Sequence, residues 1–87
     1  MKKLLVYKAP RGREIIFDSY EDDRENGRYW VEICPACHNR YRGLLKRKGI
    51  SKDPSGSGEA ACSVKGCKNE NACMYVDFDA GLVTEQE

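Results

Sequence analysis

Two pairs of cysteines are the residues in this sequence best suited to chemistry. Cys34 and Cys37 enclose two residues, whereas Cys62 and Cys67 enclose four. A thiolate pair at such spacing can bind one ion from a tight turn, and four thiolates are a common ligand set for structural zinc. The spacing therefore predicts one structural Zn²⁺ held by Cys34, Cys37, Cys62 and Cys67.

The chain has a fifth cysteine and a single histidine. We interpret Cys73 as a core thiol, with the alternative that it replaces Cys62 or Cys67 as a ligand. A second alternative is that Cys62, Cys67 and Cys73 are ordinary buried thiols. His38 directly follows Cys37, so we expect its side chain to point away from the ion and into solvent.

The residues around the cysteines favour tight turns and a closed site. Pro35 sets φ near −65° just after the first ligand, and Gly66 gives backbone freedom where we expect a Cβ to clash. Four thiolates leave no open coordination position for Lewis-acid catalysis. The Cys-Pro-Ala-Cys spacing also occurs in dithiol oxidoreductases, but no βα pattern precedes Cys34. We therefore expect no enzymatic activity and no small-molecule substrate.

The length of the chain explains why a metal would matter to it. A domain of 87 residues buries only about 60 to 65% of the surface that its unfolded chain exposes, so its core alone is marginal. Small domains usually add disulfides or a metal. We expect residues 1–79 to form a single zinc-stabilised domain and residues 80–87 to be a frayed tail.

Cysteine usage and hydropathy indicate the compartment. Five cysteines are an odd number, which argues against a closed disulfide framework and for a reducing environment. Lys2 and Lys3 precede only a short apolar run, so we expect no secretion signal. The apolar runs are too short to cross a bilayer. We therefore expect a cytoplasmic protein with no membrane partner.

The segments that must position the cysteines have mainly β character. Residues 3–8, Glu14–Tyr20 and Arg28–Ile33 are rich in β-forming residues, and a charged turn at 21–27 ends in Asn-Gly. They predict a three-strand meander that leads into the first cysteine pair. In the third strand, Trp30 and Glu32 should lie on the face opposite to the other apolar residues.

The segment between the cysteine pairs is ambiguous. Apolar residues of 39–48 fall at helical spacing and Gly49 would end a helix, but Gly43 lies in mid-segment. The alternative, which we favour, is a strand over Arg40–Lys46. Residues 49–58 are dominated by Gly, Ser and Pro and predict a flexible connection. The alternation in Cys73–Asp79 predicts a final strand.

Residues 30–42, from Trp30 through the first cysteine pair to Arg42, resemble the first half of a zinc ribbon. They are similar in particular to small zinc-ribbon proteins of conjugative and phage-like bacterial elements. The resemblance covers residues 29–79 and implies a zinc-ribbon-like fold with two cysteine knuckles. It also implies ligands at the same four cysteines. The chain departs from the pattern at His38, where ribbons commonly have Gly, and in the wider second pair.

Charge distribution indicates two classes of partner. The net charge is only +1, but residues 40–52 carry cations and no acid. Cations interleaved with an aromatic ring can contact phosphates and stack a base, which predicts nucleic-acid binding. The alternative is a protein-interaction or inhibitory module that docks on a larger protein. The candidate nucleic-acid-binding residues are Arg40, Tyr41, Arg42, Lys46, Arg47 and Lys48.

Overall fold

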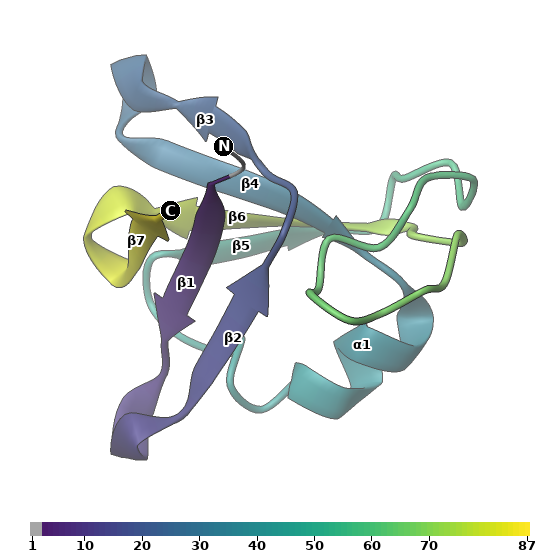
Figure 1. Ribbon diagram of the computed structural model, residues 1–87, viewed down its shortest axis with the longest axis horizontal. Helices are drawn as coiled ribbons and strands as arrows, with labels where there is room; N and C mark the ends of the chain where they lie inside the picture. The colour runs from purple at the N-terminus through teal and green to yellow at the C-terminus, as the bar shows by residue number, and fades with distance from the viewer. Residues whose placement is uncertain (1–2) are drawn as a thin grey trace.

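Two antiparallel sheets and one short helix form the fold in the computed structural model, which describes residues 3–87 apart from the Arg24 side chain (Figure 1). The prediction of a small, mainly-β fold is confirmed. One sheet has the order β2-β1-β7, with β1 at Leu4–Lys8, β2 at Glu14–Phe17 and β7 at Val83–Gln86. The other has the order β3-β4-β6-β5, with β3 at Glu21–Asp23, β4 at Arg28–Ile33, β6 at Met74–Asp79 and β5 at Ile50–Asp53. Helix α1 spans Pro35–Tyr41, and 3₁₀ turns occupy Pro10–Gly12, Arg24–Asn26 and Ala80–Leu82.

The hydrophobic core joins the two sheets and is centred on Phe78 of β6. The centroid of its ring lies 5.1 Å from that of Tyr7 in β1 and 5.7 Å from that of Phe17 in β2. Val31 and Ile33 of β4 are buried in the same core, because alternate residues of a strand point to one face. The core therefore depends on contacts between segments far apart in the sequence.

The predicted meander of the first third is wrong, because its third strand belongs to the other sheet. The expected strand segments are present, but β1 pairs with β2 and β7, whereas β4 pairs with β3 and β6. Residues 21–23, expected in a turn, form β3, and Gly27 with a φ of 66° closes the β3–β4 hairpin. Strand character is a local property, but the pairing partner is decided by burial against remote residues.

The C-terminal residues form part of the fold, which corrects the expectation that 80–87 are frayed. Strand β7 pairs with β1 in a register that sets Tyr7 opposite Val83. Glu85 accepts hydrogen bonds from the Tyr20 hydroxyl at 2.6 Å and from the Tyr29 hydroxyl at 2.7 Å. Since Tyr29 lies in β4, these bonds tie the last strand to the second sheet.

The favoured strand over Arg40–Lys46 is also wrong, because a helix begins at the cysteine motif itself. Cys34 is the N-cap of α1, with extended φ and ψ of −79° and 163°, and proline occupies the first turn. Proline suits this position because its φ is already helical and the N–H that it lacks would have no partner in the helix. The helix ends at Tyr41, so Gly43 lies beyond it rather than inside it.

Part of the predicted flexible connection forms a strand. β5 pairs with β6 along Ile50–Asp53, and Ile50 packs against the core. The backbone N–H of Asp79 donates to the carbonyl of Gly49 at 2.8 Å. Without β5, the backbone groups on one side of β6 would have no partner. Ile50, which packs against the core, sets the register of the short strand that pairs with them.

Candidate metal centre and basic hollow

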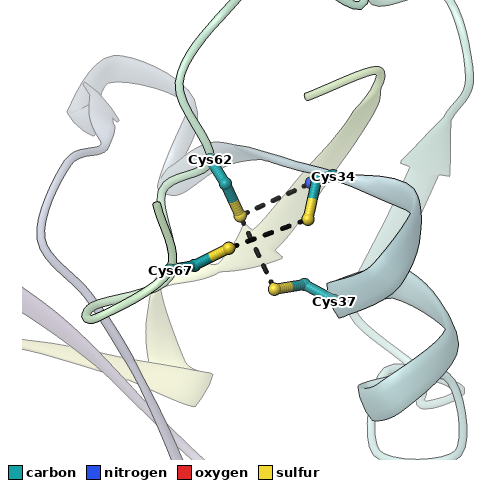
Figure 2. Close-up of side chains that lie close together, drawn as sticks. All are labelled: Cys34, Cys37, Cys62 and Cys67. Carbon is teal, nitrogen blue, oxygen red and sulfur yellow. Dashed lines mark hydrogen bonds between the residues drawn. The ribbon is translucent and has the colours of Figure 1, made fainter. Parts of the chain in front are cut away.

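The four predicted cysteines come together from two separate parts of the chain (Figure 2). Cys34 directly follows β4 and is the N-cap of α1, and Cys37 lies in the first turn of the helix. Cys62 and Cys67 lie in the loop that precedes β6. Cys34 has an exposed fraction of 0%, so one side of the centre is sealed by the core.

The sulfur separations fit a tetrahedral metal site. Sγ of Cys34 lies 3.8 Å from Sγ of Cys67, and Sγ of Cys62 lies 3.7 Å from Sγ of Cys37. All four sulfurs lie within 4.8 Å of one another. A Zn–S bond of about 2.3 Å in a tetrahedron places its sulfurs roughly 3.8 Å apart, whereas a disulfide bond is about 2.05 Å long. The four thiols are therefore free and spaced as metal ligands.

Hydrogen bonds hold the second cysteine loop against the first. The Asn69 amide donates to Sγ of Cys34 at 3.3 Å, and the backbone N–H of Cys34 donates to Sγ of Cys62 at 3.4 Å. The N–H of Ser63 donates to the carbonyl of Glu32 at 2.8 Å, which ties the loop to β4. Donors aimed at sulfur spread thiolate charge and orient the ligands.

Gly66 has a different role from the one that the sequence suggested. A Cβ at this position would meet no heavy atom within 4 Å, so the expected steric clash is wrong. Its φ of 85° lies in the left-handed region, which costs other residues about 1 to 2 kcal/mol. Glycine is therefore favoured here by the turn that brings Cys67 toward the other sulfurs.

The thiols differ in how readily they ionise. Burial opposes ionisation of Cys34, but hydrogen bonds from Asn69, Cys37 and Cys62 outweigh it and lower the pKa of Cys34 to about 6. Burial raises the pKa of Cys37, and the neighbouring thiols raise it further. Burial also raises the pKa of Cys62, where hydrogen bonds from the backbone of Cys34 and Val64 only partly oppose it. Four thiolates this close together repel one another unless a cation lies between them. A metal that binds here must therefore displace the protons that the thiols still carry. The donor set and its burial thus fit Zn²⁺, as a closed structural site.

The fifth cysteine and the histidine lie outside the cluster. Cys73 is half-buried next to β6, and its N–H donates to the carbonyl of Ile33 at 3.0 Å. His38 is also not among the clustered residues. The expectation of a solvent-facing histidine is wrong, because its Nε2 is buried and has no hydrogen-bond partner in the described part of the chain. Burial, followed by the charges of Lys52 and Arg42, lowers the pKa of His38.

The basic segment after α1 meets a second basic segment that sequence reasoning did not connect with it. A hollow of about 300 Å³ lies between the 3₁₀ turn at Pro10–Gly12 and the turn after the helix. We call it the basic hollow, and its charged lining residues are Arg11, Arg13, Lys46 and Arg47. Among the candidate nucleic-acid-binding residues, only Lys46 and Arg47 line it. Elsewhere in that set, the Arg40 guanidinium lies 5.8 Å from the centroid of the Tyr41 ring.

Comparison with protein-family models, curated proteins and solved structures finds no match to this chain. Within residues 3–87, no helix has the length and apolar character needed to cross a membrane. The structure establishes a small β fold with four cysteines at metal-binding distance.

Proposed function

We propose that this chain is a non-enzymatic, zinc-stabilised module that binds nucleic acid through phosphate contacts in the basic hollow. The observation that carries the proposal is the lining of the hollow, which has four cations from two remote segments and no carboxylate. Like charges gathered at one place repel each other and attract an anion. The closed four-thiolate set supports a structural rather than a catalytic role for the metal.

The backbone of the hairpin tip supports a binding role for this hollow. Arg11 has a φ of 66°, and it is the only residue other than glycine with a positive φ in the described chain. A left-handed arginine is strained by about 1 to 2 kcal/mol. Such strain is often found where a side chain must be presented to a ligand. Here it accompanies a guanidinium that lines the hollow beside Lys46 and Arg47.

The affinity should depend steeply on salt, because phosphate contacts release counterions. With all four lining cations engaged, the slope of log K against log salt is about −3 for single strands and about −4 for a duplex. Lys46→Gln or Arg47→Gln should reduce the slope by about 1 and weaken binding to any sequence alike. Fluorescence anisotropy with labelled DNA and RNA oligonucleotides measures both quantities.

Two further variants make this experiment specific. Lys3→Gln removes an exposed cation beyond the other end of β1 and should leave the slope unchanged. Arg11→Gly relieves the left-handed strain, so binding should weaken while the folded state is as stable as before or more so. Absence of binding at about 50 mM salt, or equal losses from Lys3→Gln and Lys46→Gln, would refute phosphate binding in this hollow.

Membership of the zinc-ribbon proteins of bacterial mobile elements is also part of the proposal. What supports it is strand β4, which carries Trp30 and runs directly into the first cysteine pair. Helix α1, which begins at Pro35, then takes the place of the strand that we expected over Arg40–Lys46. The alternative function, a protein-interaction or inhibitory module, is supported by a second surface on β4 and β6, where Trp30, Tyr75 and Asp77 line a hollow.

A further inference from the structure

The face of the four-stranded sheet that points away from the core carries two aromatic rings in contact. Trp30 of β4 and Tyr75 of β6 meet edge to face, with centroids 5.4 Å apart and planes at 75°. Both side chains are only partly buried. Their strand neighbours Val31 and Val76 point the other way and are sealed in the core. Trp30 therefore contributes little to the core and is presented on the surface.

A hollow lies over these rings. It has a volume of about 480 Å³, and we call it the aromatic hollow. Besides the two rings, it is lined by Ser51, Lys52, Asp53, Ser55 and Asp77. The sheet register explains the arrangement, since Trp30 lies opposite Asp77 and Asp53 lies opposite Tyr75. Tyr75 thus lies between Asp53 of β5 and Glu32 of β4, its partner on the other neighbouring strand.

The charges around the aromatic hollow favour a cationic ligand. An ion pair with Arg28 fixes the Asp77 carboxylate next to Trp30. Oδ1 of Asp53 accepts a hydrogen bond from the N–H of Ser55 at 3.0 Å, which orients the second carboxylate. The face of an indole ring attracts an ammonium or guanidinium group, and nearby carboxylates add to that attraction. The Arg28 guanidinium offsets the charge of Asp77, so the attraction for a cation comes mainly from the Trp30 ring and the Asp53 carboxylate.

We propose that the aromatic hollow binds a Lys or Arg side chain from a basic segment of a partner protein. The cation lies over Trp30 and within reach of Asp53, and the serines of the lining offer hydrogen bonds to the segment's backbone. Strand β5 is the outermost strand of its sheet, so an extended segment can lie along its edge beside the hollow. This site is separate from the basic hollow and does not depend on nucleic-acid binding.

The single tryptophan of the chain reports directly on this site. We would titrate the zinc-loaded protein with a capped nonapeptide of alternating arginine and serine at about 100 mM salt, where exposed charges are largely screened beyond about 10 Å. A saturable change in Trp30 emission is expected. A peptide with glutamate in place of arginine should produce no change. Absence of saturation at millimolar arginine peptide would overturn the proposal.

Variants distinguish this hollow from general attraction to acidic protein, with a fluorescein-labelled peptide as the readout. Asp53→Asn keeps the side-chain oxygen for Ser55 and should weaken binding severalfold, and Trp30→Ala should weaken it at least tenfold. Glu59→Gln removes an exposed acid outside the hollow and should change nothing. Equal effects of Asp53→Asn and Glu59→Gln would refute the assignment.

Two other occupants give different results in the same experiment. If a single-stranded oligonucleotide, rather than the peptide, quenches Trp30, the hollow stacks bases and the proposal is wrong. If the cationic residues of a second copy fill the hollow, Trp30 emission will change with protein concentration and size-exclusion chromatography will show self-association. The proposal requires a monomer whose emission responds to the arginine peptide alone.

Discussion

Cys34→Ser should abolish zinc binding and leave the chain unfolded at 25 °C. The Cys34 sulfur is fully buried, lies 3.8 Å from that of Cys67 and accepts a hydrogen bond from Asn69. A serine hydroxyl does not ionise at neutral pH and is a poor zinc ligand. Structural zinc contributes roughly 10 to 16 kcal/mol of apparent binding energy, more than the whole stability of a typical small domain. Zinc content and far-ultraviolet circular dichroism measure the two losses.

Cys73→Ser is the matched control for this experiment. Cys73 is a free, half-buried thiol that lies outside the cluster. The same substitution there should keep the zinc stoichiometry and cost at most about 1 to 2 kcal/mol, because a small, partly buried side chain changes. Full zinc content in Cys34→Ser, or loss of zinc in Cys73→Ser, would show that the ligand set is different.

Deletion of residues 80–87 should destabilise the domain by at least about 3 kcal/mol, which corresponds to a fall in Tm of roughly 12 to 24 °C. The deletion removes β7 and with it the buried side chain of Val83, whose burial alone contributes about 1.5 to 3 kcal/mol. It also removes Glu85, the acceptor for the Tyr20 and Tyr29 hydroxyls. Thermal unfolding of the zinc-loaded protein measures the effect.

A spectroscopic titration of the Tyr20 phenol measures the contact between Tyr20 and Glu85 independently. Burial, and then the Glu85 carboxylate, raise the pKa of Tyr20 from 10.0 to about 12. The protonated phenol is the form that the fold prefers. Its contribution is therefore complete below pH 10.0 and is lost as the pH rises through about 12. Glu85→Gln should bring the ionisation of Tyr20 to lower pH.

Deletion of Glu87 alone is the control for the truncation, because this residue follows the end of β7. It should leave Tm unchanged. A chain ending at residue 79 that unfolds at the same temperature as the intact protein would mean that the C-terminal strand is frayed in solution, as its sequence suggested.

The metal cluster was predictable because its signal is local. The spacing within each cysteine pair and the turn-forming Pro35 and Gly66 are visible in short stretches of sequence. The structure brings those four sulfurs together. The start of helix α1 was missed in the same stretch, because Pro35 belongs both to the turn between the first two cysteines and to the first turn of the helix. A helix was therefore considered only over 39–48, where Gly43 counted against it, and a strand was favoured instead.

What the sequence could not predict depends on pairing between remote segments. The four residues of β7 include only one buried apolar side chain, Val83, so nothing in their composition distinguishes a strand from a tail. Arg11 and Arg13 lie near the N-terminus, and only the tertiary fold sets them beside Lys46. The acidic surroundings of Trp30 were likewise invisible, because β6 brings Asp77 to β4 across more than half of the chain.

The proposal that zinc stabilises this fold is tested most directly by the metal content of the purified protein, followed through exhaustive chelation. Elemental analysis gives the stoichiometry, and amide chemical-shift dispersion in the same sample reports the fold. We predict one zinc ion per chain, and collapse of the dispersion when the ion is removed. A metal-free chain that keeps its dispersed spectrum would contradict the account.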